Sequence, residues 1–212
     1  MIDNWLSKSR LKRKYELFVK KVLYKRISPN QLTLIGLALG LSSALTLFLS
    51  SFFKINLLFI ILSVSLIVLS FFLDTLDGTL ARIEGSTIFG GIMDIFCDRA
   101  VEISIILSVV STKPFILMWP GLFSLAAMIL CISAFLIVGA KIDELKKTKS
   151  DKVLYYPNGI MERTETFIFL FLTIILMSYR FILLLIFAIL TFITALQRII
   201  GAYWFFNKSN TK

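Results

Sequence analysis

Apolar residues dominate the chain after residue 30, where they form long blocks separated by short polar breaks. The blocks cover approximately residues 31–51, 55–80, 88–111, 115–139, 164–179 and 181–206. A helix of about 20 residues spans the roughly 30 Å hydrocarbon core of a bilayer. The pattern therefore predicts an all-α integral membrane protein with six transmembrane helices, which form one domain over residues 27–212.

Residues 1–26 show a different pattern, in which lysines and arginines are interleaved with apolar residues. Such a segment is typical of an amphipathic helix that lies on an anionic membrane surface. A solvated basic arm is the alternative interpretation. A cleavable signal peptide is not expected, because nine Lys and Arg residues precede the first apolar block.

Positive charge is distributed unevenly over the six predicted helices. The chain has 23 Lys and Arg residues and a formal net charge of +10. With six spans, one side of the membrane receives only Lys54, Lys113 and Arg180. Lys and Arg favour the cytoplasmic side, so both termini and the polar loop from Lys141 to Arg163 are expected in the cytoplasm. Membrane orientation thus explains the basic composition, and no nucleic-acid partner is expected.

Composition narrows the chemistry further. With 58% hydrophobic residues and a mean hydropathy of +0.87, the chain is too apolar for an ordinary soluble domain. It contains no histidine, which excludes histidine-based catalysis. Its two cysteines, Cys97 and Cys131, both lie in apolar blocks and are interpreted as packing residues rather than as a disulfide or a metal site.

Four carboxylates lie inside or at the edge of the apolar blocks: Asp74, Asp77, Asp94 and Asp98. A charge there costs about 2.5–3.5 kcal/mol on insertion scales, so a functional role is the default interpretation. The members of the two pairs are three and four residues apart, and each pair therefore shares one helix face. A short loop joins the two helices, so all four carboxylates are expected to meet near the cytoplasmic end of an antiparallel pair.

Clustered carboxylates repel one another and need a cation. Oxygen ligands suit Mg²⁺, Mn²⁺ or Ca²⁺, and a two-metal site of the kind found in phosphoryl-transfer enzymes is plausible. Salt bridges to Arg82 and Arg99 without a metal are the alternative, but these two bases leave part of the negative charge uncompensated. Gly78 follows Asp77 at an expected helix end, where a phosphate could approach the backbone closely. Gly90 and Gly91 open the third predicted helix one turn before Asp94, and helix packing is the alternative role for such glycines.

These residues form one continuous pattern. The segment Asp74-Thr-Leu-Asp77-Gly78-Thr-Leu-Ala81-Arg82 is followed, after seven residues, by Gly90-Gly-Ile-Met-Asp94-Ile-Phe-Cys-Asp98. This pattern resembles the complete signature of the CDP-alcohol phosphotransferase family, and every fixed position matches. The Ser-Pro-Asn-Gln-Leu-Thr sequence at the start of the first predicted helix and the six-helix architecture also resemble that family.

The resemblance implies an enzyme of phospholipid synthesis, which transfers a phosphatidyl-type group from a CDP-linked lipid to a small polar alcohol and releases CMP. It implies that the four aspartates Asp74, Asp77, Asp94 and Asp98 bind Mg²⁺ or Mn²⁺, with two ions expected, and that Asp98 is the general base. It further implies a homodimer. The active site is expected on the cytoplasmic side, because the four aspartates lie near the cytoplasmic ends of their predicted helices.

Five residues are candidates for contacts to the CDP nucleotide: Asn30, Thr33, Asp74, Gly78 and Arg82. Arg82 could instead extend its charge to the membrane surface. Asn30 and Thr33 could simply cap the first predicted helix.

Three basic residues near the cytoplasmic ends of the later helices are candidates for the acceptor: Lys141, Arg163 and Arg198. The pattern Thr-Ala-Leu-Gln197-Arg198-Ile resembles the last helix of phosphatidylinositol-phosphate and archaetidylinositol-phosphate synthases, in which basic residues at these positions bind inositol phosphate. After Lys141, Ile-Asp-Glu departs from the Ala-Arg-Ala-Glu common in that branch. Lys141 and Arg163 could also be membrane anchors, and Arg198, inside an apolar helix, could pair with Glu102.

Inositol phosphate is therefore the expected acceptor, ahead of glycerol phosphate, with serine or another alcohol as further alternatives. Two other classes of function are compatible with acids inside a membrane: an ion-coupled transporter or channel, and a metal-dependent hydrolase. The four acids lie near one side and no inverted repeat is visible, which disfavours a transporter. Release of CMP only in the presence of both substrates and metal would distinguish a phosphotransferase from both.

Overall fold

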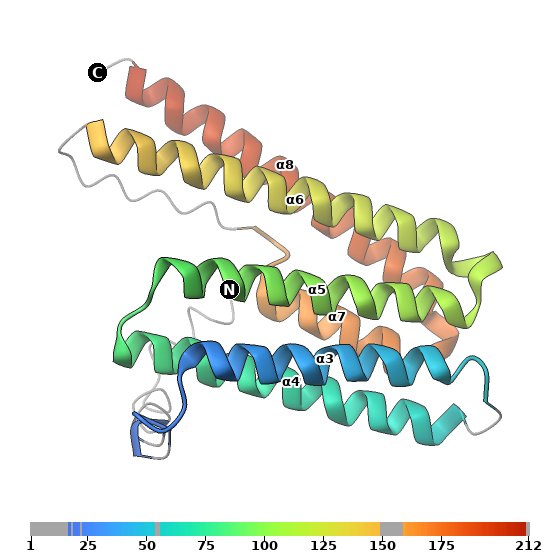
Figure 1. Ribbon diagram of the computed structural model, residues 1–212. Coiled ribbons are helices and arrows are strands. Elements are labelled where there is room, and N and C mark those ends of the chain that lie inside the picture. The colour runs from blue at the N-terminus through green and yellow to red at the C-terminus, as the bar shows by residue number, and fades with distance from the viewer. Residues whose placement is uncertain (1–16, 18, 22, 54–55, 149–158, 211–212) are drawn as a thin grey trace. The chain divides into compact units, whose positions relative to one another are not determined.

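The computed structural model describes residues 17, 19–21, 23–53, 56–148 and 159–210. In this part of the chain the regular elements are helices, and no β-strand occurs. They are α3 (Pro29–Leu49), α4 (Asn56–Glu84), α5 (Ile88–Thr112), α6 (Pro114–Thr148), α7 (Arg163–Ile175), the short 3₁₀ helix η1 (Met177–Tyr179) and α8 (Arg180–Asn210) (Figure 1). The predicted all-α fold is confirmed.

Helix ends differ from the predicted ends where a helix continues beyond its apolar block. α4 was expected to end near residue 80 but runs to Glu84, so Gly78 lies inside the helix and not at its end as predicted. α6 continues from the expected end at residue 139 to Thr148. Hydropathy detects the part of a helix that suits a membrane, whereas the backbone hydrogen bonds continue through polar residues that favour helix.

Within the described residues, four segments are long and apolar enough to cross a membrane: Pro29–Leu49, Leu57–Glu84, Pro114–Ile142 and Met177–Asn207. α7 has only 13 residues, fewer than the roughly 20 needed for a span. α5 has 25 residues, but the acids of the signature interrupt its apolar sequence. The composition is that of an integral multi-pass membrane protein, and the count of six spans stays a prediction.

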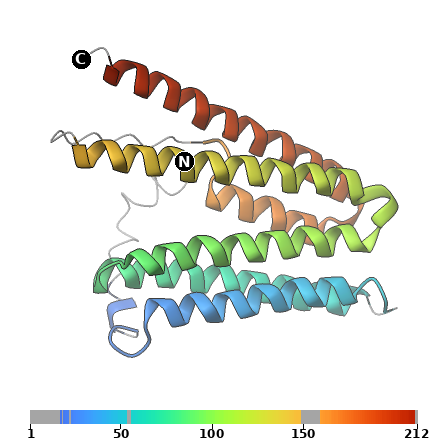
Figure 2. The same ribbon diagram turned by 45° about the horizontal axis from the view of Figure 1, so that its top comes forward.

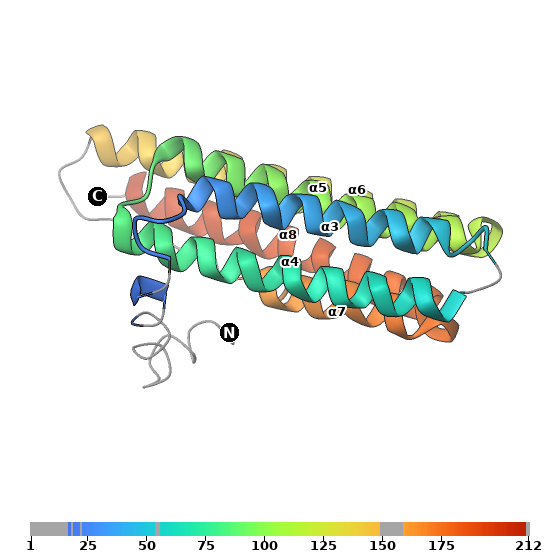
Figure 3. The same cartoon turned by 60° about the horizontal axis from the view of Figure 1, so that its bottom comes forward.

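The chain forms two compact units. The first contains Met1–Leu117 and Leu170–Arg180, and in it α3 packs along both α4 and α5 (Figure 3). Small residues let these helices approach closely, as is common in membrane proteins. A Cβ atom on Gly40 of α3 would lie 2.5 Å from Val101 of α5. Ser43 and Ser63 each donate to the other's backbone carbonyl, at 2.8 and 2.9 Å, and these bonds lock α3 to α4.

Three helix termini lie at one end of this unit: the start of α3, the end of α4 and the start of α5 (Figure 3). Ser28 caps α3 through a capping box, in which it accepts from the Gln31 amide at 3.3 Å while the Gln31 side chain accepts from the Ser28 amide at 3.0 Å. Thr87 caps α5, because its Oγ1 accepts from the Gly90 amide at 3.0 Å. Gly85, with φ +104°, supplies the left-handed residue that ends α4.

The predicted amphipathic helix over residues 1–26 falls largely outside the described residues and stays a prediction. Its described part packs against the same end of the first unit. Val19 is fully buried in a cluster with Leu32, Leu76 and Leu80, and the partly buried Leu23 lies against that cluster. Among the described residues of this segment, Val19 and Leu23 are therefore used for packing, whereas Leu17 is exposed.

Arg180 anchors the other end of the first unit. Its side chain is buried, with 4% exposure. Nε and one terminal nitrogen donate to the carbonyls of Thr173 and Ile174, at 2.8 and 3.1 Å, and the other terminal nitrogen donates to Thr112 Oγ1 at 2.9 Å. A cation at this position satisfies carbonyls at the end of α7 and ties that end to the end of α5.

The second unit contains Met118–Phe169 and Phe181–Lys212. In it α6 and α8 lie side by side (Figure 2). Ser124 of α6 donates to the Leu184 carbonyl of α8 at 3.0 Å. Farther along the same pair of helices, Val138 and Ile142 pack against Ala202.

Candidate active site

Three carboxylates converge in the first unit. Asp74 comes from α4, and Asp94 and Asp98 come from one face of α5. One carboxylate oxygen from each of the three lies within 4.8 Å of the other two, and each side chain is half-buried. The turn of three residues between α4 and α5 makes the helices antiparallel, which brings Asp74 opposite the α5 pair.

Asp77 occupies a different environment. In the part of the chain that the structure describes, it is not a member of this three-carboxylate group. It is buried, with 3% exposure, and Thr33 Oγ1 donates to its Oδ2 at 2.8 Å. Asp77 thus lies one turn beyond Asp74 on α4, next to the start of α3, and its role as a metal ligand stays a prediction.

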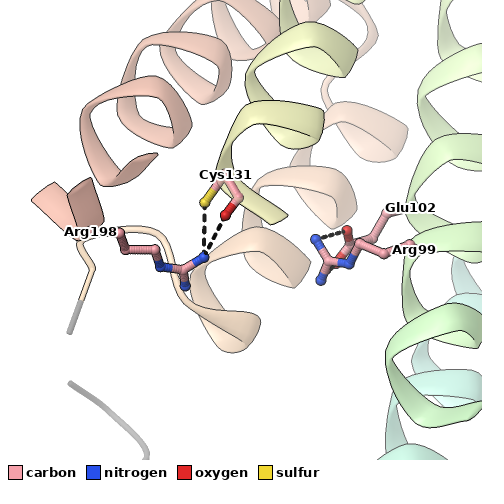
Figure 4. A network of polar contacts seen from close by, with 4 residues as sticks. All are labelled: Arg99, Glu102, Cys131 and Arg198. Carbon is pink, nitrogen blue, oxygen red and sulfur yellow. Dashed lines mark hydrogen bonds and ion pairs between the residues drawn. The ribbon is translucent and has the colours of Figure 1, made fainter. Parts of the chain in front are cut away.

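The three-carboxylate group fits a divalent cation. Carboxylate oxygens are the hard ligands that Mg²⁺ and Mn²⁺ prefer, and three negative charges this close repel one another unless a cation lies among them. The two arginines considered as alternative counter-ions donate elsewhere. Arg99 forms an ion pair with Glu102 at 2.5 Å (Figure 4), and Arg82 donates to Thr79 Oγ1 at 3.0 Å.

A cavity of about 220 Å³ opens beside this group, at the end of the unit where α3 and α5 begin. Four of the five residues predicted to contact the nucleotide line it, together with two of the signature aspartates. Its lining consists of Pro29, Asn30, Thr33, Asp77, Gly78, Ala81, Arg82, Ser86, Thr87, Gly90, Gly91 and Asp94. Residues of the signature therefore line one cavity. Asp94 belongs both to this lining and to the three-carboxylate group, so the two features are adjacent.

The walls of the cavity suit an anionic ligand. The N-terminal ends of α3 and α5 carry partial positive charge, and the Arg82 side chain is exposed. Apart from its own chain neighbours and the backbone of its own helix, no heavy atom of the described residues lies within 4 Å of a Cβ placed on Gly78 or on Gly91. A ligand can therefore come close to the backbone at these two glycines.

The capping alternative for Asn30 and Thr33 is wrong, because Ser28 is the N-cap of α3. Thr33 contacts Asp77, and Asn30 lies against the first turn of α5, with its Oδ1 3.0 Å from a Cβ placed on Gly90. Ser86 and Thr87 also line the cavity and were not among the residues predicted from the sequence. A threonine before a glycine-rich helix start is an N-cap signal that would have pointed to Thr87.

The three predicted acceptor residues all belong to the second unit. Lys141 is exposed on α6, and Arg163 is the half-buried first residue of α7. Arg198, on α8, donates from one terminal nitrogen to the carbonyl oxygen and Sγ of Cys131, both at 3.1 Å (Figure 4). Its guanidinium also lies 5.0 Å from the centre of the Phe135 ring. Among the described residues, its buried Nε has no hydrogen-bond partner.

Comparison with solved structures shows the same fold in Mycobacterium tuberculosis phosphatidylinositol phosphate synthase (PgsA1). The form with CDP-DAG bound has a TM-score of 0.68 and 19% identity, with 90% of this chain and 94% of that chain covered. The form in complex with manganese and citrate has a TM-score of 0.68 and 19% identity, with coverage of 89% and 88%. The apo form has a TM-score of 0.65 and 18% identity, with coverage of 88% and 94%.

No curated protein matches the chain by sequence. A family model does: the model described as CDP-alcohol phosphatidyltransferase matches residues 26–197. The matched region contains the four signature aspartates and every residue that lines the cavity. The chain belongs to the CDP-alcohol phosphatidyltransferase family.

Proposed function

We propose that this protein transfers a phosphatidyl-type group from a CDP-linked lipid to a hydroxyl of inositol phosphate, with release of CMP. The observation that carries the proposal is the group of Asp74, Asp94 and Asp98 beside the signature-lined cavity. Family membership supports the CDP-linked donor, and the fold shared with PgsA1, a protein solved with CDP-DAG bound, supports a lipid on that donor.

The four signature aspartates Asp74, Asp77, Asp94 and Asp98 would hold Mg²⁺ or Mn²⁺, and we propose two ions. Such ions, when bound, would neutralise the diphosphate and the charge that develops on CMP. The carboxylate oxygens of Asp74, Asp94 and Asp98, one from each, lie within 4.8 Å of one another and support this assignment for those three aspartates. The PgsA1 structure with manganese, which has the same fold, supports it as well.

The CDP nucleotide would bind in the cavity of the first unit, through Asn30, Thr33, Asp74, Gly78 and Arg82. The partial positive charge of two helix N-termini favours the diphosphate. The Arg82 guanidinium would add a positive charge at the same end of the unit, with N–H groups that can bind two phosphate oxygens at once. Gly78 would let the nucleotide lie against α4, because no side chain of the described residues, apart from its chain neighbours, lies within 4 Å of a Cβ placed on this glycine.

In the reaction, the acceptor hydroxyl oxygen attacks the phosphorus that carries the lipid. A new oxygen–phosphorus bond forms, the bond to the bridging diphosphate oxygen breaks, and CMP leaves with that oxygen. Asp98 takes the hydroxyl proton. Its place among the three carboxylates supports this role, because a general base must lie within hydrogen-bond reach of the proton that it removes.

The phosphate of the acceptor would bind Lys141, Arg163 and Arg198. Arginines bind phosphate oxygens through charge-assisted hydrogen bonds, which are about twice as strong as neutral ones. The buried Nε of Arg198, which lacks a partner among the described residues, supports a polar ligand at this arginine. Glycerol phosphate is the second candidate, because it offers the same phosphate with a smaller polyol.

In this proposal all six helices lie in the membrane, and both termini and the active site face the cytoplasm. The uneven placement of Lys and Arg supports that orientation. An active site at the cytoplasmic face would give a soluble acceptor access to the diphosphate while the lipid chains stay in the bilayer. A homodimer is proposed on family resemblance alone.

A panel of acceptors tests the proposal. The purified protein is incubated with CDP-diacylglycerol, Mg²⁺ or Mn²⁺ and one acceptor: inositol phosphate, glycerol phosphate, inositol or serine. The expected result is CMP release that is fastest with inositol phosphate. Strong activity with serine or inositol, and none with either phosphorylated acceptor, would overturn the acceptor assignment while leaving family membership intact.

A further inference from the structure

We infer that Thr194 and Gln197 are positioning residues for the acceptor: they hold residues 159–161 on α8 and so fix the start of α7, where Arg163 lies. The inference deepens the proposed function and rests on it, since Arg163 is one of the cations assigned to the acceptor phosphate. All of these residues belong to the second unit.

Two hydrogen bonds attach the segment to α8. The amide of Met161 donates to Thr194 Oγ1 at 2.9 Å, and the amide of Ile160 donates to Gln197 Oε1 at 3.2 Å. The Thr194 hydroxyl donates its own proton to the Leu190 carbonyl at 2.9 Å, so its lone pair is what receives the Met161 amide. Thr194 is fully buried and Met161 is 4% exposed, which makes an unpaired amide costly at this site.

A glycine makes this close approach possible. A Cβ atom placed on Gly159 would collide with Cγ2 of Thr194 and would lie 3.4 Å from its Cβ. Any larger residue at position 159 must therefore push the segment away from α8 or displace the threonine. The collision involves the Cγ2 methyl group of Thr194. Replacing Thr194 with serine removes this methyl group and can therefore be combined with a substitution at position 159 as a test.

These contacts limit where Arg163 can lie, because Arg163 is only a short length of chain away from them. Arg163 follows Met161 by two residues, a distance of about 7 Å at most for an extended chain. On α8, Thr194 and Arg198 are four residues apart, so they lie on the same face about 6 Å from each other along the axis. The Met161 bond therefore keeps the start of α7 next to the face of α8 that carries Arg198.

Thr194→Val tests the inference, because valine has the shape of threonine but cannot accept the amide. We expect the KM for inositol phosphate to rise about three- to tenfold, the effect of one hydrogen bond, with little change in the KM for CDP-diacylglycerol. Thr194→Ser keeps the oxygen and should give a KM within about twofold of wild type.

Gln197→Leu, at an exposed position, should raise the KM for inositol phosphate as Thr194→Val does. Gln197→Glu should raise it less, because a carboxylate oxygen can still accept the Ile160 amide.

Thr191→Val is the matched control. Thr191 lies one turn before Thr194 on α8 and is 5% exposed, but its hydroxyl has no hydrogen-bond partner within the described part of the chain. The same substitution there should leave both KM values unchanged. A general effect of an added methyl group on α8 would appear in this control as well.

A second arm uses the glycine contact. Gly159→Ala should raise the acceptor KM, and adding Thr194→Ser should reverse most of that increase, because serine lacks the colliding methyl group but keeps the oxygen. An unchanged acceptor KM in both Thr194→Val and Gln197→Leu would overturn the inference, as would equal increases in the KM of both substrates or failure of serine to rescue alanine.

These outcomes are distinct from failure of the proposed function. A wild-type protein that uses only unphosphorylated alcohols would overturn the acceptor assignment, and this inference with it. A wild-type protein that uses inositol phosphate, combined with an unaffected Thr194→Val, would overturn the inference alone.

Discussion

The Thr33 hydroxyl of α3 donates a 2.8 Å hydrogen bond to Oδ2 of Asp77 in α4, across 44 positions of the sequence. This bond joins the start of the first long helix to the signature segment. Both residues line the same cavity. The Ser-Pro-Asn-Gln-Leu-Thr sequence at the start of α3 therefore contributes to the site itself, beyond starting the helix.

Thr33→Val is predicted to weaken use of the CDP-linked donor. The substitution keeps the shape of the side chain but leaves the buried Asp77 carboxylate without this donor, which costs about 1–3 kcal/mol. We expect the KM for CDP-diacylglycerol to rise about tenfold, whereas Thr33→Ser should stay close to wild type. A normal donor KM in Thr33→Val would show that the bond has no part in binding the nucleotide.

Gly78→Ala separates a binding role of this glycine from a structural one. Gly78 lies inside α4, where alanine is the better helix former by about 1 kcal/mol, and an added Cβ meets no described atom within 4 Å. The variant should therefore be as thermally stable as wild type or more so, yet its KM for CDP-diacylglycerol should rise at least about tenfold because the methyl group enters the nucleotide cavity.

Gly139→Ala provides the control for that experiment. Gly139 also lies inside a long helix, α6, and a Cβ there meets no described atom within 4 Å. The same gain in helix propensity is expected, without any change in donor KM. The same KM for CDP-diacylglycerol in both alanine variants would show that Gly78 has no part in binding the nucleotide.

Asp98→Asn is predicted to abolish turnover while leaving most CDP-diacylglycerol binding intact. The amide keeps the size of the side chain but cannot take the hydroxyl proton, and loss of a general base lowers rates by about 10²- to 10⁴-fold. Single-turnover CMP release and donor binding, measured side by side, provide the test. Near wild-type turnover would contradict the assignment of Asp98 as the base.

Much of the site could be predicted from sequence because its residues recur at helical spacing. Asp94 and Asp98 had to share a face of α5, and a short turn had to bring Asp74 opposite them. The position of Gly78 was predicted wrongly, because hydropathy marks the edge of the membrane-suited part of α4 and not the end of its hydrogen bonds.

Contacts between helices could not be predicted, because they depend on how the helices are rotated and shifted against each other. The Thr33–Asp77 bond is one example. The partner of Arg198 is another: the sequence suggested an acid, whereas its guanidinium donates to the carbonyl and sulfur of Cys131. A carbonyl and a thiol give no signal in a charge pattern.

The predicted topology can be tested by labelling single introduced cysteines from each side of sealed membranes. Six spans place position 150 in the cytoplasm and position 113 outside, so Ser150→Cys should react only from the cytoplasmic side and Lys113→Cys only from the other. Labelling of position 150 from outside, with none at position 113, would contradict six spans. Cys97 and Cys131 are both buried, and the parent protein serves as the control for their reactivity.

We propose that this protein couples release of CMP to transfer of a lipid-linked phosphate, and that the reaction requires a divalent cation. The most direct measurement is CMP release from CDP-diacylglycerol, with phospholipid product quantified in the same sample. We predict one CMP for each phosphatidylinositol phosphate formed, no release without inositol phosphate, complete loss on chelation and recovery with Mg²⁺ or Mn²⁺. CMP release that continues at the same rate without an acceptor, or after chelation, would contradict the account.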